Sequence, residues 1–131
     1  VFEFSRSNVA SALGMTNFPE YVQILSLQRL CDNVLDPLRE LFGEPIFVNS
    51  GYRSKRLNEL FNGAKDSFHL YGCAADITAG SREKNKMLFE LLQFHDLPFD
   101  KIIDERNYAW IHVQIPKYCT DAPRKQILHL Y

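Results

Sequence analysis

The order of helical and β-rich segments along the 131 residues predicts a single α+β domain. Apolar residues recur at three-to-five spacing from Val22 to Leu41, which is typical of an amphipathic helix. A second helical pattern covers Arg82–Phe94. Two β-rich runs, Lys101–Glu105 and Trp110–Ile115, are separated by a length that suits a hairpin. We therefore expect residues 1–131 to form one domain, long enough to build a core without cross-links.

Composition excludes several classes of protein. A hydrophobic content of 46% with 24% charged residues is ordinary for a soluble globular chain, and a net charge of -1 predicts neither nucleic acid nor an anionic membrane as partner. No apolar run approaches the roughly 20 residues of a membrane span, and the first residues lack the order of a signal peptide, so we expect none in this chain unless it was removed. Three cysteines without C-x-x-C spacing argue against a disulfide framework and a thiolate zinc site.

The first half of the chain begins with a short mixed segment and continues as a long helix. Around Ser7–Leu13 we expect a docked arm or a short helix. Asn17 is a candidate cap for the long helix, with Pro19 near its first turn. Pro37 should kink or divide this helix, and Gly43 is placed to end it.

The remaining elements are shorter, and each is bounded by residues that favour turns or helix caps. The apolar residues expected inward on the helix after Ser81 are Met87, Leu88, Leu91 and Leu92. The other predicted elements are a strand Ile46–Val48, a helix Ser54–Phe61, a buried strand Ala74–Thr78 and a small edge strand Gln126–Tyr131.

His69 and Asp76 are candidate ligands of one metal ion. A carboxylate in the otherwise apolar strand Ala74–Thr78 is costly unless a cation or hydrogen-bond donors face it. Gly72 lets the backbone bend between the two residues, so the imidazole can turn toward the same point. Histidine and carboxylate are two of the three protein ligands found in catalytic zinc sites.

The third ligand is expected to be His112. His95 lies at a helix end and His129 lies in the tail, whereas the alternation in Trp110–Ile115 places Trp110, His112 and Gln114 on one face of a strand. That face is suited to line the floor of a pocket. A lone histidine at this position is also compatible with a structural or surface role.

Glu105 and Arg53 are candidate catalytic residues. If residues 106–109 form the hairpin loop, Glu105 faces Trp110 and shares the face of His112, where it could act as general base. It could equally be a surface glutamate at a hairpin end. Arg53, in a tight turn after Tyr52, suits recognition of a carboxylate or amide carbonyl, or a salt bridge that holds the turn to the helix.

Three motifs in order resemble the zinc D-alanyl-D-alanine carboxypeptidase family, peptidase family M15, particularly its M15A-like members. They are S-G-Y-R-S at residues 50–54, S-x-H-x-x-G-x-A-x-D at residues 67–76 and W-I-H-V at residues 110–113. The family belongs to a superfamily that also includes lysostaphin-type peptidases and hedgehog amino-terminal domains. The stretch from Val34 to Arg53 resembles the small single-domain branch found in bacteria and their phages.

The resemblance implies a small antiparallel sheet packed with helices on one side. It implies that His69, Asp76 and His112 bind Zn²⁺, that Arg53 polarises the substrate carbonyl and that Ser67 contacts the peptide. Tyr52 and Trp110 are further candidates for substrate contact. The implied substrate is a peptidoglycan stem peptide, cut as a D,D-carboxypeptidase or an L,D/D,D-endopeptidase, by a monomer in the cell envelope, outside the cell, or in the cytoplasm until lysis for a phage-type endolysin.

One position departs from the family pattern. Many members carry an acidic residue three positions before the last histidine, where this chain has Ala109. Either Glu105 takes over as base, which is the favoured interpretation, or the protein binds zinc and wall peptide without efficient turnover. A zinc hydrolase for another small peptide or amide is a third possibility.

Overall fold

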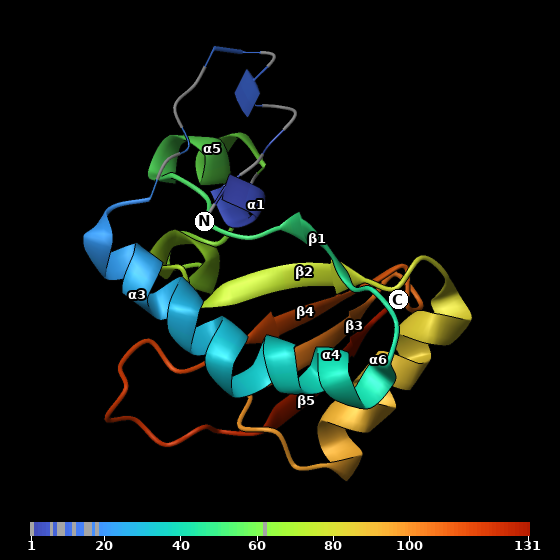
Figure 1. Cartoon of the computed structure of the whole chain (residues 1–131). Coiled ribbons are helices and arrows are strands. Elements are labelled where there is room, and N and C mark those ends of the chain that lie inside the picture. Colours follow the sequence, from blue (N-terminus) through green and yellow to red (C-terminus); the bar gives the residue numbers. More distant parts are fainter. Residues whose placement is uncertain are drawn as a thin grey trace.

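The computed structural model shows an α+β fold and describes residues 2–5, 7, 10–11, 13–14, 17, 19–61 and 63–131 (Figure 1). The α+β prediction is confirmed. Helices are α1 (Phe2–Ser5), α3 (Tyr21–Leu30), α4 (Asp36–Phe42), α5 (Lys55–Leu60) and α6 (Arg82–Phe94), with a π-helical turn at Cys31–Leu35 and a 3₁₀ turn at Phe68–Tyr71. Strands are β1 (Phe47–Ser50), β2 (Ala74–Thr78), β3 (Lys101–Glu105), β4 (Trp110–Gln114) and β5 (Gln126–Leu130).

The strands form one sheet in the order β1-β2-β4-β3-β5. Neighbours from β1 to β3 are antiparallel, but β5 runs parallel to β3, so the sheet is mixed and the expectation of a wholly antiparallel sheet was wrong. The cause lies at Asp100, just before β3. Its carboxylate binds the side chain of Arg124 and its carbonyl accepts from the amide of Gln126, so β5 starts where β3 starts.

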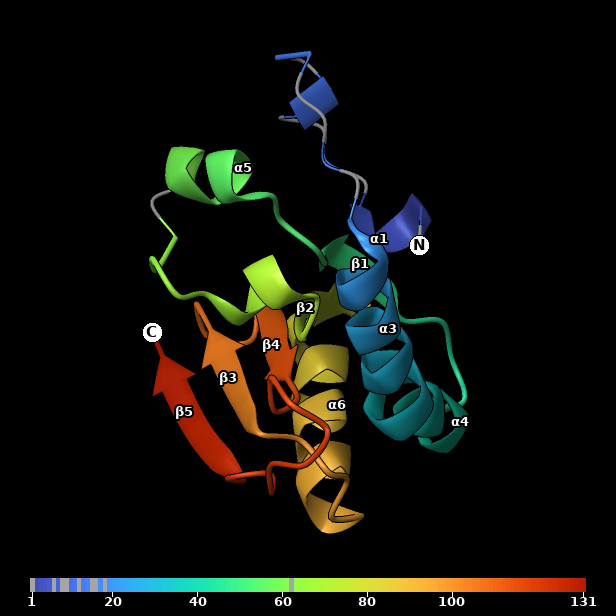
Figure 2. The same ribbon diagram turned by 90° about the vertical axis from the view of Figure 1, so that its left-hand side faces the viewer.

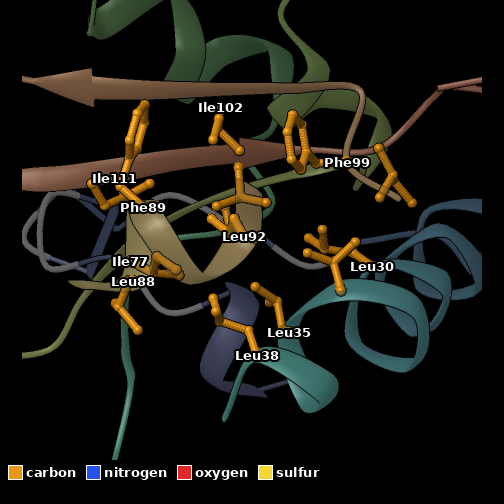
Figure 3. Packing of buried hydrophobic residues seen from close by; sticks show 14 of the residues in the cluster. Leu30, Leu35, Leu38, Ile77, Leu88, Phe89, Leu92, Phe99, Ile102 and Ile111 are labelled. Carbon is orange, nitrogen blue, oxygen red and sulfur yellow. The ribbon is translucent and has the colours of Figure 1, made fainter. Parts of the chain in front are cut away.

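Helices α3, α4 and α6 cover one face of this sheet (Figure 2). Leucines of α4 and α6 meet the inward residues of β2 and β4 in the core, as Figure 3 shows for Leu38, Leu88, Ile77 and Ile111. Alternation along β4 sends Ile111 and Val113 into this core and His112 to the opposite face. The face of the sheet opposite to these three helices is therefore where polar side chains can gather.

The long helical stretch is divided, as predicted at Pro37. The π-helical turn comes directly before α4, which has Pro37 in its first turn, where a residue without an amide proton is tolerated. Gly43 ends α4 in the left-handed conformation, with φ 79. Both predictions for this segment are confirmed.

The prediction that Asn17 caps the long helix was wrong. Glu20 is the cap of α3, and its amide donates to the Gln23 side chain at 2.6 Å. Asn17 is buried instead and joins three segments, donating to the carbonyls of Ser5 and Tyr52 and accepting from the amide of Ser54. The short helix expected at Ser7–Leu13 lies partly outside the described residues.

The later elements follow the predictions closely. Strand β2 and helix α6 have the predicted bounds, and Ser81 caps α6 through its hydroxyl. Met87 is 50% exposed, contrary to expectation, while Asn85 and Phe89 are buried in its place. Strand β1 begins one residue later than predicted and ends at Ser50. Among the residues that the structure describes, no helix combines the length and apolarity needed to cross a membrane.

Alanine at Gly72 should destabilise the fold more than alanine at Gly43. Both glycines have positive φ, 71 and 79, so both variants carry backbone strain. At Gly72 a Cβ would also lie 2.5 Å from the Gln23 carbonyl oxygen of α3, whereas no described atom lies within 4 Å at Gly43. We expect a loss of about 1 kcal/mol for Gly43→Ala and about 2–4 kcal/mol for Gly72→Ala, measured by urea unfolding. Equal losses of unfolding free energy in the two variants would show that the close contact between α3 and this turn does not limit the side chain at position 72.

Candidate metal centre

Three side chains from separate segments converge on the face of the sheet opposite to α3, α4 and α6. His69 comes from the 3₁₀ turn, Asp76 from β2 and His112 from β4, and one donor atom of each lies within 4.8 Å of the others. Asp76 and His112 are direct partners in the register of β2 and β4. The structure therefore brings together the three residues predicted as ligands, in a group that could hold a metal ion.

His69 is held in one orientation by the backbone around it. Its Nδ1 lies 2.7 Å from the carbonyl oxygen of Gly51, which can only accept, so Nδ1 carries the proton. Nε2 then faces Asp76 Oδ1 at 3.5 Å. The hydroxyl of Ser67 caps the turn by accepting from the amide of His69, and the His69 carbonyl accepts from Arg53. The side chain is 2% exposed and cannot rotate freely.

His112 is oriented from both of its ring nitrogens. Nδ1 lies 3.1 Å from Asp76 Oδ1, and Nε2 lies 2.8 Å from the side-chain oxygen of Gln114. An amide oxygen accepts, so Nε2 carries a proton and Nδ1 is the nitrogen that faces Asp76. Each imidazole thus turns its second ring nitrogen toward the same carboxylate.

Two of the three donor spacings are close to those around a tetrahedral divalent ion, and all three donor atoms lie within 4.8 Å of one another. Zinc lies about 2.0–2.2 Å from imidazole nitrogen and carboxylate oxygen, so neighbouring donors on a tetrahedron are about 3.3–3.5 Å apart. The distances from Asp76 Oδ1 to His112 Nδ1 and to His69 Nε2 are 3.1 and 3.5 Å. Two histidines and one carboxylate also match the ligand types of catalytic zinc sites, which leave a fourth position open.

Electrostatics favour a charged carboxylate at this point. Burial raises the pKa of Asp76, but the two imidazoles outweigh that effect and hold the pKa well below its ordinary range. Burial lowers the pKa of His112, while its hydrogen bond to Asp76 and the charge of that carboxylate raise the pKa above its usual value. Because a proton and a metal ion compete for His112, metal affinity should fall as the pH falls.

A cleft of about 290 Å³ opens above these residues. Its walls include Arg53, Ser67 and Glu105. The guanidinium of Arg53 is fixed from three sides, because it bonds to Ser50 Oγ, Asn58 Oδ1 and, at 3.4 Å, Asp76 Oδ2. The salt bridge of Arg53 runs to Asp76 of β2, and its contact with helix α5 is the hydrogen bond to Asn58, so a salt bridge from the turn to the helix is not what the structure shows. Arg53 also lies in the cleft wall, where its predicted contact with substrate stays a prediction.

Glu105 lies on the face predicted from the hairpin register. It pairs with Trp110 across β3 and β4, and Ile103 pairs with His112. Glu105 lines the cleft with His69, Asp76 and His112, whereas its neighbour Asp104 bonds to the amide of Tyr108 and to His129 on the other side. Trp110 Nε1 donates to Glu105 Oε2 at 2.5 Å, which leaves the other carboxylate oxygen available.

The remaining two predicted contact residues do not line the described part of this cleft. Tyr52 is buried, and burial, together with the charge of Glu20, raises the pKa of its phenol. Trp110 is half-buried beside Glu105, and the Arg106 guanidinium lies over its ring. Their predicted contact with substrate stays a prediction.

Several residues of the site were missed from the sequence. Gln114 was placed on the correct face without a role, and Asp100, which binds Gln114 at 3.0 Å, was not considered. Asn58 binds Arg53 and the carbonyl of Ala64 from inside α5. The signal that could have found Gln114 is its position two residues after His112 on the same face of a strand.

Asp100 should stabilise the fold in a pH-dependent way. Burial raises its pKa, but hydrogen bonds from Arg124 and Gln114 outweigh this, so its pKa in the folded protein is lowered. A lowered folded pKa gives stability that is complete above the unfolded value of about 3.9 and is lost as pH falls. We expect Asp100→Asn to cost about 2 kcal/mol at pH 7. Urea unfolding at lower pH should show this difference closing below about pH 4; a constant difference would contradict the account.

Comparisons with known proteins agree with this geometry. The family model of Peptidase M15 matches residues 2–114. A zinc D-Ala-D-Ala carboxypeptidase of Streptomyces albus G is 47% identical over 49 residues, which are 37% of this chain and 19% of that protein. The chain thus spans about a fifth of that relative's length in the aligned part.

Proposed function

The chain belongs to the Peptidase M15 family, and from this we propose that it is a zinc-dependent peptidase of bacterial cell-wall peptides. The substrate would be the peptidoglycan stem, cut at a bond that involves a D-amino acid. The observation that carries the proposal is the convergence of His69, Asp76 and His112 at the floor of an open cleft. The Streptomyces relative, described as a zinc D-Ala-D-Ala carboxypeptidase, supports the choice of metal and substrate.

The three ligands would hold zinc with His69 Nε2, His112 Nδ1 and a carboxylate oxygen of Asp76. When bound there, zinc supplies a Lewis acid that polarises the scissile carbonyl and lowers the pKa of an attacking water. Gly51 and Gln114 already accept from the opposite ring nitrogens, so His69 Nε2 and His112 Nδ1 are the nitrogens that remain to bind zinc. The two imidazole rings would therefore need little reorientation to bind the metal.

Glu105 would act as general base and then as general acid. Its Oε1 would take a proton from the attacking water and return it to the leaving amine. Trp110 holds Oε2 and so keeps the carboxylate in the cleft wall. This assigns the base role to β3, in place of the family carboxylate that is absent at Ala109.

Arg53 would stabilise the negative charge that develops on the substrate carbonyl oxygen. Its guanidinium is fixed by Ser50 and Asn58, and a fixed donor stabilises developing charge without further ordering. Ser67, in the same wall, would contact the peptide backbone.

A second candidate function is a zinc-containing module that binds wall peptide without cleaving it. Ala109 favours this alternative, because it removes the acidic residue expected three positions before His112. A more distant alternative is a zinc hydrolase that acts on another small peptide or amide.

Purified protein incubated with peptidoglycan, followed by mass analysis of the products, tests the proposed reaction. Release of a terminal D-amino acid would indicate a carboxypeptidase, and separation of cross-linked stems would indicate an endopeptidase. A protein that holds one zinc ion and binds stem peptide but yields no product would be the binding module. Turnover of other amides alone would favour the third alternative.

The substrate also bears on where the protein works. We propose a monomer of one domain that acts in the cell envelope or outside the cell, or in the manner of a phage endolysin that waits in the cytoplasm until lysis. Cell fractionation and size-exclusion chromatography would check these two points.

A further inference from the structure

We infer that Lys101 selects peptides that carry a free carboxylate in the half of the substrate that keeps the scissile carbonyl. The inference rests on the proposed function, because it narrows the choice of substrate for the same cleft. Lys101 is the first residue of β3, and it lines the cleft together with the three candidate zinc ligands. Neither the metal nor the proposed proton transfer requires a lysine at this position.

Strand β3 presents a cation, an apolar side chain and an anion to the cleft in turn. These residues are Lys101, Ile103 and Glu105, which alternate along the strand and all line the cleft. Ile103 pairs with His112 in the register of β3 and β4, so Lys101 and Glu105 lie on either side of that ligand. A strand rises about 3.3 Å per residue, which places each of the two about 7 Å along β3 from Ile103.

The side chain of Lys101 has no ion-pair or hydrogen-bond partner among the residues that the structure describes. The acidic residues that line the same cleft are bound elsewhere: Asp66 to Lys117, Asp76 to Arg53, His69 and His112, and Glu105 to Trp110. Asp100, next to Lys101 in the sequence, binds Arg124 and Gln114 instead. A partly buried cation in the cleft wall is therefore left for a carboxylate that the ligand supplies.

The position of Glu105 decides which half of the peptide reaches Lys101. In the proposed mechanism Glu105 returns a proton to the leaving amine, so the leaving half begins on the Glu105 side of His112. The other half, which keeps the scissile carbonyl, then extends toward Lys101. An extended peptide spans about 3.3–3.6 Å per residue, so about 7 Å corresponds to two residues. The carboxylate is therefore expected on the residue before the one that contributes the scissile carbonyl.

The discrimination comes from charge. A carboxylate at that point forms a charge-assisted hydrogen bond with the ammonium of Lys101, whereas an amide of the same shape offers only a neutral oxygen. Hydrogen bonds to charged groups contribute enough to separate two such ligands about 10- to 100-fold in affinity. Lysine donates as a compact point charge, so it does not require the fixed paired geometry that an arginine would use.

Two peptides that cannot be cleaved form the matched pair of probes. They are N-acetyl-Glu-D-Ala-D-Ala and N-acetyl-Gln-D-Ala-D-Ala, each with a methylene group in place of the nitrogen of the last amide bond. They differ only in charge at the residue before the one with the scissile carbonyl. A third probe combines the glutamate with a C-terminal amide, so that the terminal carboxylate is tested by itself. Calorimetric titration of the zinc-loaded protein gives the dissociation constants.

The variants are Lys101→Met, which removes the charge, Lys101→Arg, which keeps it, and Lys86→Met as the control. Lys86 is an exposed lysine of α6, which covers the other face of the sheet. The parent and Lys86→Met should bind the glutamate probe about 10- to 100-fold more tightly than the glutamine probe. Lys101→Met should bind both with similar affinity, and Lys101→Arg should keep most of the preference. Each protein is compared with itself, so a loss of stability alone does not change this ratio.

Equal dissociation constants for the glutamate and glutamine probes in the parent would overturn the inference. A preference that survives unchanged in Lys101→Met would overturn it as well. If Lys101→Met instead removes the effect of C-terminal amidation, Lys101 binds the terminal carboxylate and the assignment to the other half of the peptide is wrong. Binding of these probes needs no cleavage, so each of these results is separate from failure of the proposed peptidase activity. Absence of binding by all three probes would contradict the proposed substrate itself.

Discussion

Alanine in place of His69 or Asp76 is expected to abolish stoichiometric zinc binding and to reduce peptide hydrolysis by at least roughly 10³-fold. The reduction follows because the metal supplies several kcal/mol of stabilisation to the developing charge, and each 1.4 kcal/mol is a factor of ten. Asp76 lies between the two imidazoles and His69 is buried beside it, so either change leaves an incomplete set of donors. Metal analysis of the purified variants and the rate of stem-peptide cleavage measure the two effects.

The control is His95→Ala, which removes an exposed imidazole at the end of α6. It should keep both zinc and activity. Thermal unfolding gives a second readout, since zinc that binds only the folded protein should raise the Tm of the parent and of His95→Ala. Full zinc content in both His69→Ala and Asp76→Ala would show that the ligand assignment is wrong.

Glu105→Gln is expected to lower kcat by about 10²- to 10⁴-fold while zinc content stays unchanged. Glutamine keeps an oxygen that can accept from Trp110 Nε1, so the side chain should keep its place in the cleft wall. What is lost is the ability to take the proton from water. Steady-state kinetics on a synthetic stem peptide, with metal analysis of the same samples, separates the two properties.

Glu44→Gln is a suitable control for that variant, because Glu44 is an exposed residue whose partner is Lys84. It should leave kcat unchanged. Full activity in Glu105→Gln would place the base elsewhere, and absence of turnover in the zinc-loaded parent would favour the binding module instead.

The elements next to the site were predictable from sequence because each carries a strong local signal. Ala74–Thr78 is a short apolar run with one carboxylate, and Ser81 places an N-cap before α6. The predicted hairpin register placed Glu105 and His112 on one face, because side chains along a strand point alternately to the two faces of the sheet once the loop is located. The convergence of His69, Asp76 and His112 could be inferred from these placements and from the family resemblance.

The missed features depend on contacts between segments distant in the sequence. The parallel pairing of β5 follows from Asp100 binding Arg124, and no local pattern indicates which edge a tail strand joins. Asparagine is a residue type that is favoured at helix N-caps, but at Asn17 three tertiary hydrogen bonds outweigh that preference. The hairpin loop has three successive residues with positive φ, Arg106, Asn107 and Tyr108, where glycine would be expected. In this conformation the amide of Tyr108 donates to Asp104 Oδ1, and the side-chain amide of Asn85 donates to the Tyr108 carbonyl.

Diffraction at the zinc absorption edge from crystals of the zinc-loaded protein tests the central claim most directly. The account predicts one strong anomalous peak in the cleft, about 2.0–2.2 Å from His69 Nε2, His112 Nδ1 and a carboxylate oxygen of Asp76. A peak elsewhere, or a peak that lacks any one of these three contacts, would contradict it.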